Sequence, residues 1–233
     1  MPFMRWTEQP VFFIDFEGSL GSGVLEYGIV TLFGGAVTET RTRLCAATGR
    51  VRPGDVEVHG LTADRVAGLR PLAEDWDLFA DLRERGPFAA HYAGAENALL
   101  KSVWAYPRSS PDFARSGERS IDWGPWIDSA RLYGQLYPRL ESGRLETVIA
   151  ACGLQEELDG LAASHCPPDR RRYHAALYDA LAGALLLASL ARQPQLEAMT
   201  VMQLLALSTL DAAKRESIVQ RELFGTPEGT GSK

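Results

Sequence analysis

Two acidic residues near the start of the chain are spaced so that their side chains fall together. Asp15 and Glu17 end an apolar, β-prone run that begins at Val11. Side chains alternate between the two faces of a strand, so both acids point to one face while the apolar Ile14 and Phe16 point to the other. Two clustered carboxylates repel each other and resist desolvation unless a cation lies between them. The spacing favours a site for a hard divalent cation, although acids facing solvent at a strand end give the same pattern.

A histidine followed five residues later by an acid occurs twice further along the chain. His91 and Glu96 join a short apolar strand to a predicted helix, and an acid in a first helical turn is stabilised by the helix dipole whatever its other role. His174 and Asp179 open a long apolar helical pattern. Residues five apart on a helix diverge by about 140°, so His174 and Asp179 share a site only if His174 lies on the preceding loop. Helix capping or an ion pair with a nearby arginine is the alternative role for Asp179.

The secondary-structure elements that must position these residues are mostly strands in the first part of the chain and mostly helices in the second. The predicted strands cover residues 11–17, 24–33, 37–44, 88–92 and 120–123. The predicted helices cover residues 62–68, 72–85, 94–104, 126–137, 145–151, 174–191 and 200–223, and residues 106–119 form a loop. This order predicts an α/β fold with a mixed central sheet, a three-stranded antiparallel meander plus parallel strands, flanked by helices.

Composition limits the class of protein. The chain has 233 residues, a formal net charge of −6 and 45% hydrophobic residues, which is typical of a globular protein. The acidic total disfavours a protein that coats nucleic acid through bulk charge, but not one that binds it at a small site. Three cysteines without a C-x-x-C pair disfavour a disulfide framework or a zinc ribbon. The first ten residues are too polar for a signal peptide, and the longest apolar run, 180–191, is too short to span a membrane, so a soluble cytoplasmic protein is expected.

In order and spacing, the three acidic motifs resemble those of the DEDDh family of 3′–5′ exonucleases, which includes polymerase proofreading subunits and ribonuclease T. The segment Val58-His59-Gly60-Leu61-Thr62 also resembles a His-Gly-Ile-Thr stretch of that family. The resemblance runs from about Val11 to Leu190 and implies a ribonuclease H-like fold. The chain departs from the family pattern where Glu96 replaces Asp, Tyr92 replaces Asn, and Gly18-Ser19-Leu20 replaces Thr-Thr-Gly.

The resemblance implies hydrolysis of phosphodiester bonds at nucleic-acid 3′ ends, with release of nucleoside 5′-monophosphates. Two divalent cations, Mg²⁺ or Mn²⁺, would be bound by the four acids Asp15, Glu17, Glu96 and Asp179. His174 would act as the general base that accepts the proton of the attacking water. The implied substrate contacts are Phe16, Gly18, Ser19, His91 and Tyr92. The expected substrate is a single-stranded 3′ end, and no residue in the sequence chooses between DNA and RNA.

Several alternatives stay open on the sequence alone. The protein would alternatively be a module that binds nucleic acid or a partner and has weakened catalysis, because Glu96 departs from the family's Asp. A second alternative is a ribonuclease H-like endonuclease. The aromatic rings of Phe16 and Tyr92 would stack on bases or pack in the core. The arginine run 170–172 would bind the phosphate backbone or form a solvated charge cluster.

The predicted organisation has four parts. A lead-in covers residues 1–10, the exonuclease domain 11–195, a C-terminal helical extension 196–224 and a disordered tail 225–233. The extension carries an apolar stripe formed by Val201, Leu204, Leu205 and Leu210. This stripe would pack on the domain or on a second copy of the chain, and the second arrangement would make the protein a homodimer.

Overall fold

A five-stranded mixed sheet forms the centre of the computed structural model, which describes residues 4–208. Three strands form the antiparallel meander that the sequence predicts: β1 (Val11–Ser19), β2 (Gly23–Phe33) and β3 (Ala36–Leu44). The strands β4 (Phe88–Ala90) and β7 (Trp126–Asp128) continue the sheet in parallel on the other side of β1. The strand order is therefore β3-β2-β1-β4-β7.

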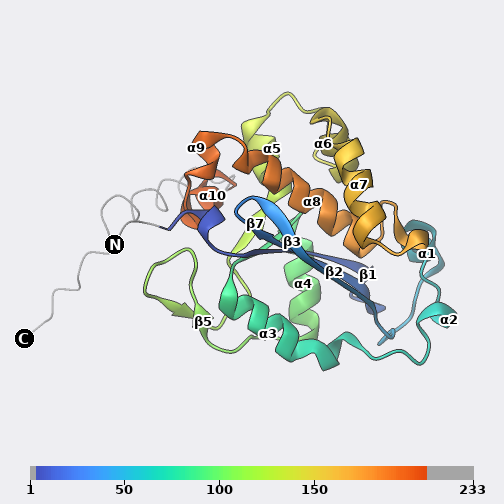
Figure 1. Ribbon diagram of the computed structural model, residues 1–233. Coiled ribbons are helices and arrows are strands. Elements are labelled where there is room, and N and C mark those ends of the chain that lie inside the picture. Colours follow the sequence, from blue (N-terminus) through green and yellow to red (C-terminus); the bar gives the residue numbers. More distant parts are fainter. Residues whose placement is uncertain (1–3, 209–233) are drawn as a thin grey trace, which may run out of the picture.

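Helices cover both faces of this sheet (Figure 1). One face is covered by α8 (Ala176–Ala191), with α5 (Ser129–Leu136), α6 (Leu145–Ala151) and α7 (Gln155–His165) packed beside it. The other face is covered by α3 (Trp76–Arg85) and α4 (Ala93–Val103). Nearly every side chain of α8 is buried, which explains a sequence that is apolar around its whole circumference. Within residues 4–208, no helix combines the length and the apolarity that crossing a membrane requires.

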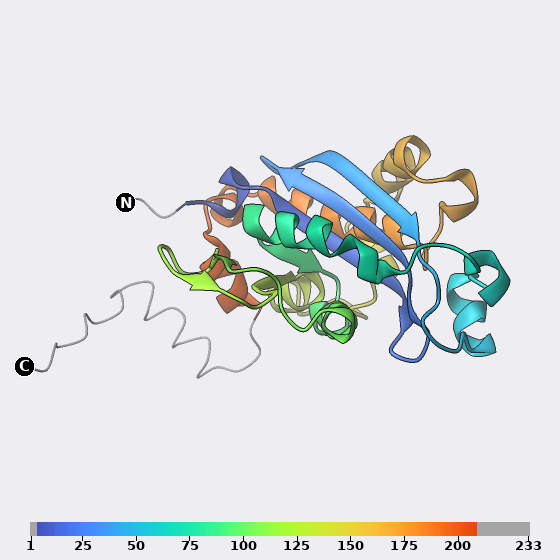
Figure 2. The ribbon, with the colours of Figure 1, turned by 90° about the horizontal axis from the view of Figure 1, so that it is seen from below.

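The remaining elements lie at the two ends of the sheet. The helices α1 (Pro53–His59) and α2 (Ala63–Val66) lie at the end where β1 finishes, and the hairpin of β5 (Ser110–Pro111) and β6 (Arg119–Ser120) lies at the opposite end (Figure 2). Three 3₁₀ turns, η1 (Trp6–Glu8), η2 (Leu72–Asp75) and η3 (Pro168–Arg170), and the helices α9 (Pro194–Glu197) and α10 (Val201–Leu207) complete the described part.

Strand β1 is apolar on both faces because helices cover both of them. Phe13 packs in the cluster beneath α8, whereas Phe12 and Ile14 pack with α3 and α4. Asp15 and Glu17 continue the row that contains Phe13, so both acids face α8 as their spacing predicts. The strand thus has a closed apolar stem and a polar carboxyl end.

The predicted boundary between the last strand and the next helix was wrong. The strand predicted over 120–123 lies instead at Trp126–Asp128, and the helix predicted from residue 126 begins at Ser129. The helix begins there because the Asp128 side chain accepts a hydrogen bond from the Arg131 amide, which is a helix N-cap. The Trp123 indole is buried and donates to the Trp104 carbonyl oxygen at 2.8 Å, so residue 123 belongs to the loop that packs on α4.

The chain ends of the described part pack on each other and on the core. Trp6 is buried and its indole N–H donates to the Leu196 carbonyl oxygen at 2.8 Å. Val201 and Leu204 of the predicted apolar stripe are buried in the same cluster as α8, so this part of the stripe packs on the domain. Leu210, the rest of the helix predicted to residue 223, and the tail 225–233 lie outside the described residues.

A close contact between α8 and the sheet gives a stability prediction. A Cβ atom at Gly183 would lie 2.0 Å from the Phe13 ring, whereas one at Gly160 on α7 would meet no atom within 4 Å. Gly183→Ala is expected to lower the free energy of unfolding by about 1–3 kcal/mol through overpacking. Gly160→Ala is the matched control, and it is expected to raise that energy by up to about 1 kcal/mol through helix propensity. Urea unfolding measures both, and equal effects would contradict the packing argument.

Candidate active site

The three acidic motifs meet where β1 and β4 end. Asp15 and Glu17 lie on β1, Glu96 lies in the first turn of α4, and Asp179 lies in the first turns of α8. The Glu96 carboxylate accepts a hydrogen bond from the Phe16 amide at 3.0 Å, which ties α4 to the end of β1. The fold therefore gathers four carboxylates that are as far apart as 164 residues in the sequence into one site.

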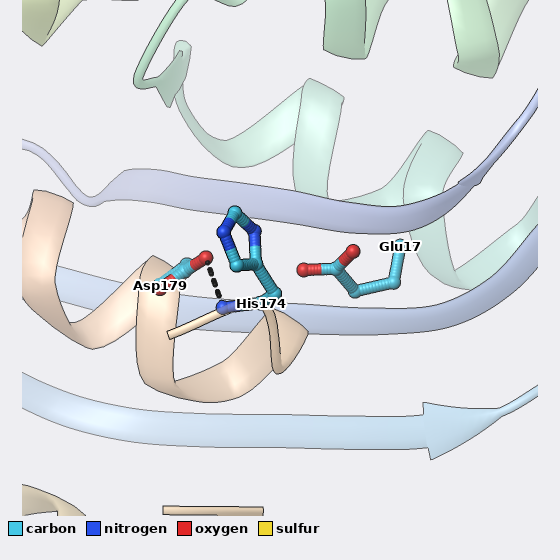
Figure 3. Close-up of side chains that lie close together, drawn as sticks. All are labelled: Glu17, His174 and Asp179. Atoms are coloured by element: carbon cyan, nitrogen blue, oxygen red, sulfur yellow. Dashed lines mark hydrogen bonds between the residues drawn. The ribbon is translucent and has the colours of Figure 1, made fainter. Parts of the chain in front are cut away.

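His174 joins this cluster from the loop that precedes α8. One ligand atom each of Glu17, His174 and Asp179 lies within 4.8 Å of the other two. Figure 3 shows the Glu17 carboxylate pointing toward the His174 imidazole, and the His174 amide donating to Asp179 Oδ2 at 3.0 Å. Because α8 begins only at Ala176, the condition set by the sequence is met: His174 lies outside the helix and shares a site with Asp179.

Burial and mutual repulsion raise the pKa of all four carboxyl groups. Desolvation is the largest cause in each case, and it raises the pKa of Glu17 and of Glu96 to about 8 and that of Asp179 to about 7. The pKa of Asp15 is also raised well above its usual value, by desolvation first and then by the negative charges of Glu96, Asp179 and Glu17. Without a cation, this cluster therefore disfavours its own full ionisation.

The donor set fits divalent cations. Asp179 Oδ1 is buried and has no hydrogen-bond partner, so it is free to bind a cation. Carboxylate oxygens are the ligands that Mg²⁺ and Mn²⁺ prefer, and a cation among four such groups would offset the repulsion that raises their pKa values.

Three of the predicted substrate contacts lie at the end of β1 but are engaged within the protein. The Phe16 ring is 5% exposed and packs against Phe79, so it offers no face to a base and only its backbone reaches the site. Gly18 sits at a β-bulge with φ of 134°, where a Cβ atom would lie 2.3 Å from the Gly23 carbonyl oxygen. The Ser19 hydroxyl lies 3.1 Å from the Ser22 hydroxyl inside the β1–β2 turn.

The other two predicted contacts differ in accessibility. His91 is buried; its Nε2 donates to the Gly143 carbonyl oxygen at 2.7 Å, and its Nδ1 lies 2.9 Å from the Ser129 hydroxyl oxygen. Burial lowers the pKa of His91, which keeps the ring neutral near pH 7. Tyr92 has a left-handed backbone with φ of 63°, and 51% of it is exposed at the start of α4. Of these two residues, Tyr92 is the exposed one, and it lies four residues before Glu96.

The arginine run 170–172 divides between one buried residue, Arg170, and two exposed ones, Arg171 and Arg172. Arg170 is buried and forms an ion pair with Glu26 of β2. Arg171 donates to the carbonyl oxygens of Cys166 and Ala163, and Arg172 donates to that of His59. Sequence reasoning missed Glu26, although a charged residue inside an apolar strand is a signal that a buried partner exists.

The raised pKa values predict a metal-free protein that loses stability above neutral pH. An unfolded Asp or Glu titrates near pH 4, whereas Glu17 and Glu96 hold their protons to about pH 8 when folded. In this window the folded state binds more protons than the unfolded state, so the free energy of unfolding falls as pH rises. From about pH 7 to about pH 8.5 the expected loss is about 1 kcal/mol for each of these groups. Burial lowers the pKa of His59 and His91, which makes stability rise with pH, but only below about pH 7, where an unfolded histidine still binds a proton.

Thermal unfolding in EDTA and in Mn²⁺ checks this pH dependence. In EDTA, the melting temperature is expected to decrease as the pH is raised from about 7 to about 8.5. Glu17→Gln is expected to make that decrease smaller. Mn²⁺ binds the deprotonated carboxylates, so its stabilising effect is expected to grow with pH. A melting temperature that rises with pH in EDTA would contradict the assigned electrostatics.

Comparisons with known proteins give matches at the level of structure. No protein-family model and no curated protein sequence matches the chain. Exonuclease X in complex with 5′-overhanging duplex DNA is similar over 85% of this chain and 99% of its own, with 20% identity and a TM-score of 0.60. The nuclease domain of 3′hExo, a DEDDh family member bound to rAMP, is similar over 84% and 98%, with 14% identity and a TM-score of 0.59.

A third match extends over part of a longer protein. Exonuclease I of E. coli in complex with a dT13 oligonucleotide is similar over 81% of this chain and 42% of its own, with 16% identity and a TM-score of 0.56. Similarity at these levels of identity establishes the fold. The ribonuclease H-like α/β fold with a mixed sheet flanked by helices, expected from the sequence, is thereby confirmed.

Proposed function

We propose that this protein is a metal-dependent 3′–5′ exonuclease that hydrolyses the terminal phosphodiester bond of a nucleic acid and releases nucleoside 5′-monophosphates. The observation that carries the proposal is the convergence of Asp15, Glu17, Glu96, Asp179 and His174 at the carboxyl ends of β1 and β4. A fold shared with solved exonucleases supports it.

Each residue has a role that follows from its chemistry and place. Asp15, Glu17, Glu96 and Asp179 would hold two divalent cations, Mg²⁺ or Mn²⁺, and Asp179 Oδ1 is a buried oxygen without a hydrogen-bond partner. Bound divalent cations supply charge neutralisation for the phosphoryl group and lower the pKa of water. His174 is exposed on its loop, where its imidazole is accessible to take the proton of the attacking water.

Glu96 in place of the family's Asp is compatible with this role. Its Oε2 accepts from the Phe16 amide, and its position in the first turn of α4 directs the longer side chain to β1. The hydrogen bond fixes one carboxylate oxygen and leaves the other to a cation. Glu96→Asp would shorten the side chain by one methylene and remove that reach.

The proposed substrate is the single-stranded 3′ end of DNA or RNA. Among the aromatic residues predicted to contact the substrate, Tyr92 is the exposed one. Stacking of a base on an aromatic ring works for any base, in DNA or in RNA. The similar structures include one with duplex DNA that carries a 5′ overhang and one with a ribonucleotide, so both polymers belong in the test.

A digestion panel tests the proposal. Single- and double-stranded DNA and RNA are incubated with Mn²⁺, Mg²⁺ or EDTA, together with a circular single strand and a 3′-phosphorylated strand. Cation-dependent loss of linear substrates, with the circle and the blocked end intact, is expected. Cleavage of the circle would favour the endonuclease, and Mn²⁺ binding without any cleavage would favour the binding module.

A further inference from the structure

A buried ion pair lies directly behind the His174 loop. Glu26 on β2 is 3% exposed and Arg170 is 4% exposed, and the guanidinium contacts both carboxylate oxygens. Glu26 is opposite Glu17 in the antiparallel pairing of β1 and β2, so the two side chains lie on the same face of the sheet. The pair therefore sits beside the proposed metal ligands without being one of them.

This ion pair holds the backbone on both sides of Ala175, the residue that follows His174. Arg170 Nη2 donates to the His174 carbonyl oxygen at 3.2 Å. The amide of Ala176, two residues later, donates to Glu26 Oε2 at 3.1 Å. Arg170 Nη1 also donates to the His59 carbonyl oxygen at 2.7 Å, which anchors the guanidinium to the end of α1. One guanidinium and one carboxylate thus fix the two peptide groups that flank the Ala175 residue next to His174.

The same backbone is pressed directly against the sheet at a second point. A Cβ atom at Gly28 of β2 would lie 2.3 Å from the Ala176 carbonyl oxygen. Glu26 and Gly28 are two residues apart and face the same side, so the loop is held by a polar contact at one position and by close packing at the next.

His174 has a backbone conformation that is unfavourable for a non-glycine residue and that persists only when the surrounding structure fixes it. Its φ is 60°, in the left-handed region. Its amide then points to Asp179 Oδ2, and its side chain reaches the carboxylates although it is exposed. Because the side chain is exposed, the backbone has the larger part in fixing its position.

We propose that Glu26 and Arg170 are positioning residues that hold His174 against the carboxylate cluster. The proposal rests on the proposed function, in which His174 takes a proton from water. The alternative is that the pair only stabilises the fold. A buried ion pair is weak evidence for stability, because the desolvation of both charges offsets their attraction.

Replacing both charges at once separates positioning from stability. In Glu26→Met/Arg170→Met, no uncompensated charge is left in the interior, and such replacements are often neutral or stabilising for the fold. We expect a melting temperature near that of the wild type, a kcat lower by about 10- to 100-fold as for other residues that orient a site, and a KM changed by less than about twofold. Faster hydrogen exchange at the His174 amide, whose acceptor is Asp179, is also expected.

The matched control is an ion pair on the opposite face of the sheet. Arg43 of β3 pairs with Asp75 next to α3, and both side chains are largely buried. Asp75→Asn is expected to lower the melting temperature and to leave kcat and the His174 exchange rate unchanged. If the Met/Met variant does not fold, Arg170→Lys serves instead: it keeps the charge but not the planar fork that reaches Glu26 and two carbonyl oxygens together, so kcat is again expected to fall.

The outcomes that overturn the proposal are distinct from those that overturn the proposed function. Wild-type kcat and unchanged exchange at the His174 amide, in either folded variant, would show that the pair does not position the loop. If the wild-type protein releases no nucleotide, the proposed function fails, and the exchange measurement still decides whether Glu26 and Arg170 hold His174 in place.

Discussion

Asp15→Asn is expected to abolish cation-dependent nucleotide release and, at the same time, to make the metal-free protein more stable. Asp15 lies among Glu17, Glu96 and Asp179, and desolvation together with their charges raises its pKa well above the usual value. The loss of this carboxylate would remove a ligand that contributes several kcal/mol of transition-state stabilisation, which corresponds to at least about a 10³-fold fall in kcat. It would also remove a repelled charge, and one pKa unit of relief is worth about 1.4 kcal/mol.

Activity and melting temperature, measured on the same preparation, check this pair of effects. In EDTA near pH 8 the variant is expected to melt a few degrees above the wild type, and Mn²⁺ is expected to stabilise it less. Asp81→Asn on α3 is the control, because Asp81 is an exposed acid that pairs with Arg108. A variant that keeps its activity, or that melts below the wild type in EDTA, would contradict the assignment of Asp15.

His174→Ala is expected to reduce kcat by about 10²- to 10⁴-fold, the range that general acid–base catalysis supplies. The side chain is exposed on the loop before α8, so its removal leaves the core and the four carboxylates in place. The shift in melting temperature caused by Mn²⁺ is therefore expected to stay close to that of the wild type. This separates a base from a metal ligand, because loss of a ligand would weaken Mn²⁺ binding as well.

The matched control for this variant is His165→Ala. His165 is also exposed and is the last residue of α7. Its Nδ1 lies 3.2 Å from the hydroxyl of Thr40 on β3, and it is not part of the carboxylate cluster. It is expected to have wild-type kinetics. Equal effects of the two substitutions would refute the base role of His174, and a lost Mn²⁺ shift in His174→Ala would reassign it as a ligand.

The parts of the fold that the sequence predicted are those in which local pattern and burial agree. The strand at residues 11–17 is apolar on both faces because helices cover both faces, and the alternation of side chains placed Asp15 and Glu17 together. Local geometry also set the condition for His174: residues five apart on one helix cannot face the same site, so His174 had to lie before the helix, although the predicted helix began at residue 174 and α8 begins at Ala176. These inferences need no knowledge of distant contacts.

The parts that the sequence did not predict depend on contacts between distant residues. Helix α7 has only Leu158 and Ala162 buried, so its apolar pattern is too weak to identify it, and α1 buries only His59. The local sequence of residues 126–128 is compatible with a strand and with a helix, and these residues form a strand because they pair with β4. Arg170 and Glu26 are 144 residues apart, and nothing local distinguishes Arg170 from its two arginine neighbours.

The chemistry of the first product tests the central claim most directly. A single-stranded oligonucleotide with a labelled 5′ end is incubated with Mn²⁺, and the shortened strands and released nucleotides are identified by mass spectrometry. The expected products are strands that shorten by one nucleotide at a time from the 3′ end, with 3′-hydroxyl ends, and nucleoside 5′-monophosphates; none of them is expected in EDTA or with Asp15→Asn. Internal fragments, 3′-phosphate ends or cleavage that persists in EDTA would contradict it.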